Sequence, residues 1–128
     1  MAPAPRRITE RGRGMPDPTG RAAPGPARHE LPVIDDLALA AARHADLLLA
    51  EARERGATRW VKFLEPLPDR LRDDEVRALR STAMRARAAY GTNDSIRDAL
   101  PSDLTEPFLE ALDRLLRRLA REANRPRS

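Results

Sequence analysis

Apolar side chains recur at intervals of three and four residues in three long segments, and this spacing predicts three main α-helices. We expect these helices over residues 35–55, 73–90 and 105–123. The apolar positions on their core-facing sides are Ile34, Leu37, Ala41, Ala45, Leu48, Ala52, Val76, Leu79, Ala83, Ala86, Tyr90, Phe108, Leu112, Leu115 and Leu119. The pattern therefore predicts an all-α fold, a compact bundle of three main helices.

Capping residues indicate where these helices begin and end. Asp35 or Asp36 is suited to the N-cap of the first helix, and Gly56 is suited to its C-terminal stop. Gly91 is expected to end the second helix in the same way. Thr105 is the expected N-cap of the third helix, because a proline then falls in the first turn, where no amide donor is needed.

The link between the first two helices contains large apolar residues followed by prolines. Trp60 and Phe63 keep helical spacing, so we expect a short helical turn over 58–64. Pro66 and Pro68 then break any regular continuation, which predicts a corner without helix. We expect Trp60 to anchor this corner on the core; the alternative is an exposed Trp–Phe hook that binds a partner.

The second link, residues 91–107, is dense in turn-forming residues. Asn93 or Asp94 is expected to cap a short helical turn near 94–100, which a proline then ends. Every turn-forming residue is thus explained by the start or the end of a helix, and we interpret the stretch as a structural connection. The alternative is a polar binding surface made by Asn93, Asp94, Ser95, Arg97 and Asp98.

The chain divides into a helical domain and two tails. Residues 1–30 hold half of the twelve prolines and almost no large apolar residues, so we predict a disordered arm rich in Pro, Gly and Arg. Residues 31–124 form the helical domain, and residues 125–128 are expected to fray. The formal charges of these three segments are +3, −1 and +2, so the net charge of +4 comes from the tails.

The composition excludes several kinds of chemistry. Without cysteine, disulfides, thiolate metal sites and cysteine nucleophiles are impossible. His44 is the one histidine of the predicted domain, it has no second histidine at i+4, and we interpret it as a structural residue. No serine lies in a nucleophile motif and no glycine-rich phosphate loop is present. We therefore predict a protein that is not an enzyme and has no catalytic, cofactor-binding or metal-binding residues.

The cellular setting also follows from composition. No apolar run approaches the roughly 20 residues of a membrane span, and no signal peptide is recognisable, so we expect a cytoplasmic protein without membrane contact. Arginine supplies 23 of the 24 basic residues, beside many alanines, which is typical of a GC-rich bacterial genome.

The remaining features favour a small helical adaptor or accessory subunit that acts through protein–protein contacts, as a homodimer or with another protein. The first helix carries apolar residues over more than the ~100° arc that a one-sided surface helix needs. Leu39 and Leu47 fall outside its main stripe and are the hypothetical interface, with Ala42, Ala50 and Ala57 allowing close approach. The predicted core comprises Leu37, Leu48, Trp60, Leu79, Phe108, Leu112, Leu115 and Leu119.

The alternative function is binding of nucleic acid. Arg77, Arg80 and Arg87 lie within an arc of about 80° on the second helix, close enough to contact neighbouring phosphates. The basic tail would add salt-dependent attraction. The near-neutral helical domain, at −1, speaks against this function.

Overall fold

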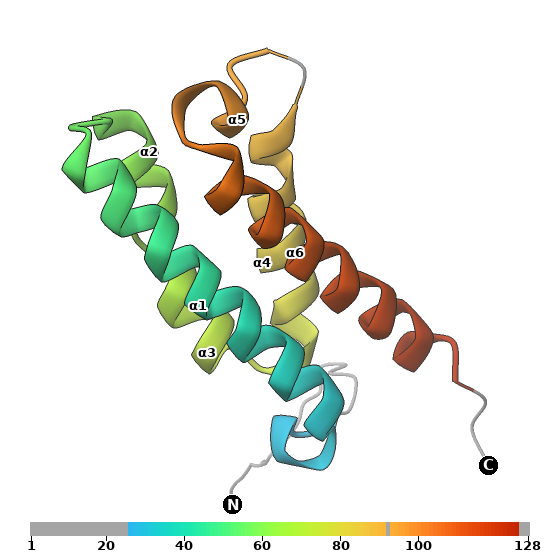
Figure 1. The fold of residues 1–128 in the computed structure, drawn as a ribbon. Helices are drawn as coiled ribbons and strands as arrows, with labels where there is room; N and C mark the ends of the chain where they lie inside the picture. The colour runs from blue at the N-terminus through green and yellow to red at the C-terminus, as the bar shows by residue number, and fades with distance from the viewer. Residues whose placement is uncertain (1–25, 92, 126–128) are drawn as a thin grey trace, which may run out of the picture.

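The computed structural model describes residues 26–91 and 93–125, and all regular structure in these residues is helical (Figure 1). In chain order the elements are the 3-10 helix η2 (Arg28–Glu30), α1 (Pro32–Glu54), α2 (Thr58–Leu64), α3 (Leu67–Asp73), α4 (Val76–Arg87), the 3-10 helix η3 (Ala88–Tyr90), α5 (Ile96–Ala99) and α6 (Ser102–Ala123). The prediction of an all-α fold is confirmed. The predicted count of helices is not, because α3 occupies the segment expected to be a corner.

The first predicted helix is α1, and it begins three residues earlier than expected. Leu31 occupies the N-cap position without a side-chain hydrogen bond, and Pro32 follows it as the first helical residue. Proline is tolerated there because its missing amide donor would have no partner in the helix. Asp35 and Asp36 therefore lie inside α1, and the prediction that one of them caps it is wrong.

The end of α1 follows the prediction. Gly56 has a φ of +67°, the left-handed conformation that glycine adopts at little cost. Its amide donates to the carbonyl of Arg53 at 3.1 Å, and the amide of Ala57 donates to the carbonyl of Ala52 at 2.9 Å. These two bonds are the Schellman arrangement, which satisfies carbonyls at the end of a helix.

The link after α1 is more helical than predicted. The expected turn over 58–64 is α2, and its Trp60 is buried, with the ring of Phe63 edge-on at a centroid distance of 5.6 Å. Pro66 and Pro68 stand at the N-cap and in the first turn of α3, so they begin a helix. The expectation that they exclude helix from this corner is wrong, because a proline in a first turn breaks no helical hydrogen bond.

The second predicted helix is represented by α4 and η3, which cover residues 76–90 of the expected 73–90. Gly91 follows η3 with a φ of −64°, so it does not form the left-handed stop that was predicted. The short turn near 94–100 is α5, and its N-cap is Ser95, whose hydroxyl accepts from the amide of Arg97 at 3.1 Å. The prediction of Asn93 or Asp94 as the cap is wrong.

The third predicted helix is α6, which also begins three residues early. Pro101 is at its N-cap without a side-chain bond, and Thr105 lies fully buried inside the helix. Pro107 is likewise inside α6. The prediction that Thr105 caps this helix is therefore wrong.

The core lies between α1 and the helices that pack on it. Figure 1 shows α1 and α6 side by side and running in opposite directions, with α3 and α4 behind them; α1 packs on α6, α3 and α2, and α4 packs on α6 and α3. Of the eight predicted core residues, all but Leu37 are buried, and Leu37 is partly buried against the core. Within the part of the chain that the structure describes, no helix is long and apolar enough to cross a membrane.

The segment just before α1 is fixed by an arginine. Arg28 donates from Nε to Asp35 at 2.8 Å, and from Nη1 to the carbonyls of Leu71 at 2.8 Å and Asp74 at 3.0 Å. Its side chain is only 11% exposed. The last residues of the segment expected to be disordered thus have a defined place on the bundle, whereas residues 1–25 of that segment lie outside the described residues.

Candidate functional site

The described residues hold no assembled metal site. No three His, Asp or Glu side chains within residues 26–91 and 93–125 lie together in a way that could hold a metal ion. His44 is half-buried on α1. The candidate functional features lie on the surface of the helices.

The outer side of α1 carries an apolar line. Val33 is 46% exposed and Leu47 is 54% exposed; apart from Met84 on α4, no other large apolar side chain in the described residues is classed as exposed. Leu37, Ala40 and His44 lie between them, partly exposed. The spacing from Val33 to Leu47 is four, three, four and three residues, which places all five on one side of a helix. We call these five residues the α1 line.

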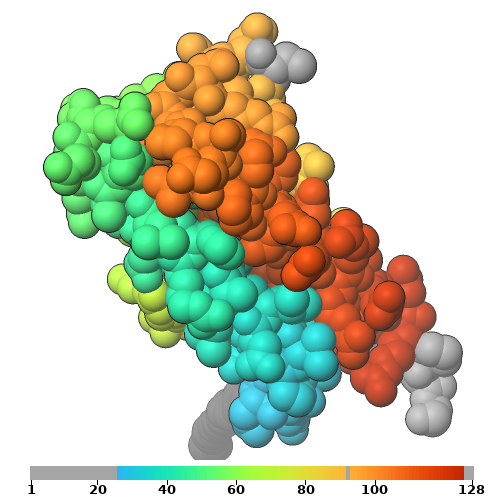
Figure 2. All heavy atoms as spheres, in the orientation of Figure 1, coloured from blue at the N-terminus to red at the C-terminus, as the bar shows by residue number. Residues whose placement is uncertain are grey.

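The helix that carries this line lies at the surface beside α6. Figure 2 shows the two helices next to each other on the face turned to the viewer, with no other described element in front of them. Val33 and Leu47 are exposed, and Leu37, Ala40 and His44 are partly exposed.

Two charged residues lie on the same outer side of α1. Three acids elsewhere on this helix form ion pairs, Asp35 with Arg28, Asp46 with Arg72 and Glu51 with Arg55, whereas Glu54 forms none within the described residues. Asp36 and Arg43 are exposed, and neither forms an ion pair with any residue that the structure describes.

The two predicted interface residues differ in exposure. Leu47 belongs to the α1 line, whereas Leu39 is half-buried and lies about 80° away around the helix. Ala42, which was expected to allow close approach of a partner, is fully buried in the core and cannot do so. Ala40 is the small residue that faces outward along the line. Sequence reasoning missed Val33 and Ala40, although their spacing from Leu47 was a usable signal.

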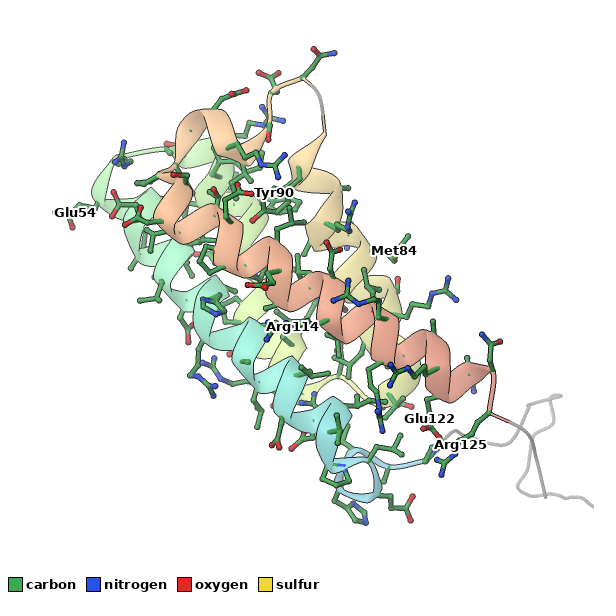
Figure 3. All side chains as sticks on the ribbon, turned by 45° about the vertical axis from the view of Figure 1, so that its right-hand side comes forward. Glu54, Met84, Tyr90, Arg114, Glu122 and Arg125 are labelled. Atoms are coloured by element: carbon green, nitrogen blue, oxygen red, sulfur yellow. The ribbon has the colours of Figure 1, made fainter. Side chains whose placement is uncertain are left out.

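The three predicted phosphate-binding arginines are all exposed on α4, but they differ in their partners. Arg87 Nε donates to Asp113 Oδ1 on α6 at 2.5 Å, and this hydrogen bond raises the pKa of the arginine. Arg77 and Arg80 form no ion pair within the described residues. Met84 projects outward from α4 (Figure 3) and is 51% exposed, and its spacing of seven and four residues from Arg77 and Arg80 places it on their side of the helix.

The connection over 91–107 is held by a compact polar cluster. Arg97 donates from Nε and Nη2 to the two carboxylate oxygens of Glu106, at 2.8 and 2.9 Å, and its guanidinium lies 5.3 Å from the centre of the Tyr90 ring. Tyr90 (Figure 3) donates its hydroxyl hydrogen to the carbonyl of Thr105. Hydrogen bonding from Arg97 lowers the pKa of Glu106, while burial, and then the charge of Glu106, raise the pKa of Tyr90.

Three of the five residues that were expected to form the alternative binding surface make contacts within the protein instead. Ser95 is buried as a helix cap, Arg97 is paired with Glu106, and Asp94 lies 3.5 Å from Arg59. Asn93 and Asp98 are exposed; within the described residues the Asn93 amide makes no hydrogen bond and the Asp98 carboxylate makes no ion pair. The arrangement supports the interpretation of a structural connection.

Comparison with known proteins identifies no relative: no family model matches the chain, and neither the curated proteins nor the solved structures contain a significant match.

Proposed function

We propose that this protein is a non-enzymatic helical adaptor or accessory subunit that binds a protein partner through the outer side of α1. The observation that carries the proposal is the α1 line, with its two exposed apolar side chains and the neighbouring charges of Asp36 and Arg43, which form no ion pair within the described residues. Contiguous exposed apolar residues with a polar border are typical of protein–protein contacts.

The size of the line predicts a modest affinity. Val33 and Leu47 are each about half exposed, so covering both contributes on the order of 2 kcal/mol. Association costs about 4–15 kcal/mol in lost motion and ordering. The two side chains alone are therefore insufficient, and the charged border and the smaller residues of the line must also contribute. We expect a dissociation constant in roughly the micromolar range.

Site-specific photo-crosslinking tests this proposal. Leu47 is replaced by benzoylphenylalanine in cells of the source organism, and Met84 is replaced in a control of matched exposure, 51% against 54%. We expect a cross-linked protein adduct from position 47 and none from position 84. Absence of an adduct at position 47, or equal adducts at both positions, contradicts the proposal.

A second candidate function, binding of nucleic acid, is favoured by one observation: Arg77 and Arg80 are exposed on the same side of α4 without an ion pair in the described residues. If they contact phosphates, replacing both with Ala should reduce the slope of log affinity against log salt by about 2. The control replaces Arg53 and Arg114, which are exposed but paired with acids. A mixed oligonucleotide that does not bind at low salt excludes this function.

A further inference from the structure

We infer that the partner of α1 is a second copy of this chain, bound with the two α1 helices antiparallel and crossing at Ala40 on a two-fold axis. This inference rests on the proposed function and identifies the partner. It also replaces the interface predicted from Leu39 and Leu47 with one centred on the α1 line.

The apolar residues are placed symmetrically about Ala40. Val33 lies seven residues before it and Leu47 lies seven residues after it, which is about 10.5 Å along the helix in each direction. In an antiparallel pair that crosses at Ala40, Val33 of each copy therefore meets Leu47 of the other. A two-fold interface makes each such contact twice, so four exposed side chains are covered.

The residue at the crossing point permits close approach. Ala40 is partly exposed on the same side of α1 as Val33 and Leu47, with the three residues inside an arc of about 40°. Its methyl group is the smallest side chain on the line, so the helix axes can approach closely where they cross. Leu37 and His44 then flank the crossing.

The charges on the border are self-complementary in the same arrangement. Asp36 lies four residues before Ala40 and Arg43 lies three residues after it. Antiparallel crossing at Ala40 brings Asp36 of each copy next to Arg43 of the other, which forms two equivalent ion pairs. A parallel arrangement would instead bring like charges together, which is unfavourable. Both residues are exposed and unpaired in the described residues, so no existing bond has to break.

A second copy explains these features together. An unrelated partner would need complementary residues of its own, but it would not require apolar residues at equal distances, and opposite charges at nearly equal distances, on either side of one alanine of this chain. A two-fold pair does require that symmetry.

Charge reversal tests the inference. Asp36→Arg and Arg43→Asp each place like charges opposite one another twice, so each variant alone should dimerise at least about tenfold more weakly than wild type. An equimolar mixture of the two variants restores both ion pairs and should associate with near wild-type affinity. Glu54→Arg is the control, because Glu54 is exposed on α1 but lies fourteen residues from Ala40. The dimerisation affinity of this variant should differ from that of wild type by less than twofold.

Sedimentation over a concentration series at low salt measures these affinities, and circular dichroism checks that each variant is folded. A wild-type protein that remains monomeric up to millimolar concentration overturns the inference, as does a dimer that neither reversal weakens. A wild-type monomer that still yields an adduct with another protein from position 47 overturns only the inference and leaves the proposed function in place.

A second measurement locates the axis. The chain lacks cysteine, so Ala40→Cys introduces a single thiol at the proposed crossing point. Its two copies would lie close enough for a disulfide to form. Mild oxidation should link Ala40→Cys into a covalent dimer and leave Ala50→Cys, an exposed control on the same helix, unlinked. Equal linking of both variants contradicts a crossing at Ala40.

Discussion

At the scale of single residues, Tyr90 shows how the connection between α4 and α6 is held. Its hydroxyl donates to the carbonyl of Thr105, and the guanidinium that pairs with Glu106 also lies over its ring. Both the burial of the phenol and the negative charge of Glu106 disfavour the phenolate, and they raise the pKa of Tyr90. The connection is thus fixed by contacts of the side chain that ends η3.

This arrangement predicts a delayed ionisation of Tyr90. Because the folded-state pKa lies above the unfolded value of about 10, the contribution of the protonated phenol to stability is complete below pH 10 and is lost as pH rises further. The chain has one tyrosine, so absorbance at 295 nm follows this group alone. We expect a higher midpoint in the native protein than in denaturant, and no transition in Tyr90→Phe. Equal native and denatured midpoints would show that the phenol is not buried.

The residues of the α1 surface were predictable only in part. Helical spacing identified Leu47 and Leu39 as lying outside the main stripe, and Leu47 is indeed exposed while Leu39 is half-buried. Spacing gives the angle of a residue around a helix, but it does not say which edges of that helix the neighbouring helices cover. The burial of Ala42 has the same cause, since α1 is covered by α6 on one edge and by α2 and α3 on the other.

At the scale of elements, periodicity predicted the location of the long helices but not their starts. Both α1 and α6 begin three residues early, after Leu31 and Pro101, whose side chains make no capping bond. Caps of this kind have no sequence signature, whereas the side chains of Asp35, Asp36 and Thr105 are of the types that favour an N-cap position. Among the described α-helices, the side-chain cap at Ser95 is the exception.

Proline was the other source of error at this scale. Pro68 lies in the first turn of α3, where it is compatible with a helix. Pro107 was expected in the first turn of the third helix, but it lies further inside α6 because this helix begins earlier. The same residue type thus begins one helix and is tolerated within another. The flanking residues favour the helix after Pro66, because Leu67 and Leu71, four residues apart on α3, are both buried.

At the scale of the whole molecule, α1 contributes both to the core and to the accessible surface. Its inner side is buried against α2, α3 and α6, and its outer side carries the α1 line with Asp36 and Arg43 beside it. A small domain buries a limited fraction of its surface when it folds alone. Association through the uncovered side of its longest helix is therefore an economical way to bury more.

Light scattering over a range of concentrations tests this account most directly, with Leu47→Glu as the disrupting variant and Met84→Glu as a control of matched exposure. The account predicts that the wild-type mass rises from one chain toward two as concentration increases. Met84→Glu should behave in the same way, whereas Leu47→Glu should remain at the mass of one chain because it places a carboxylate against the partner's Val33. A wild-type mass of one chain at every concentration, or the same association in both variants, would contradict it.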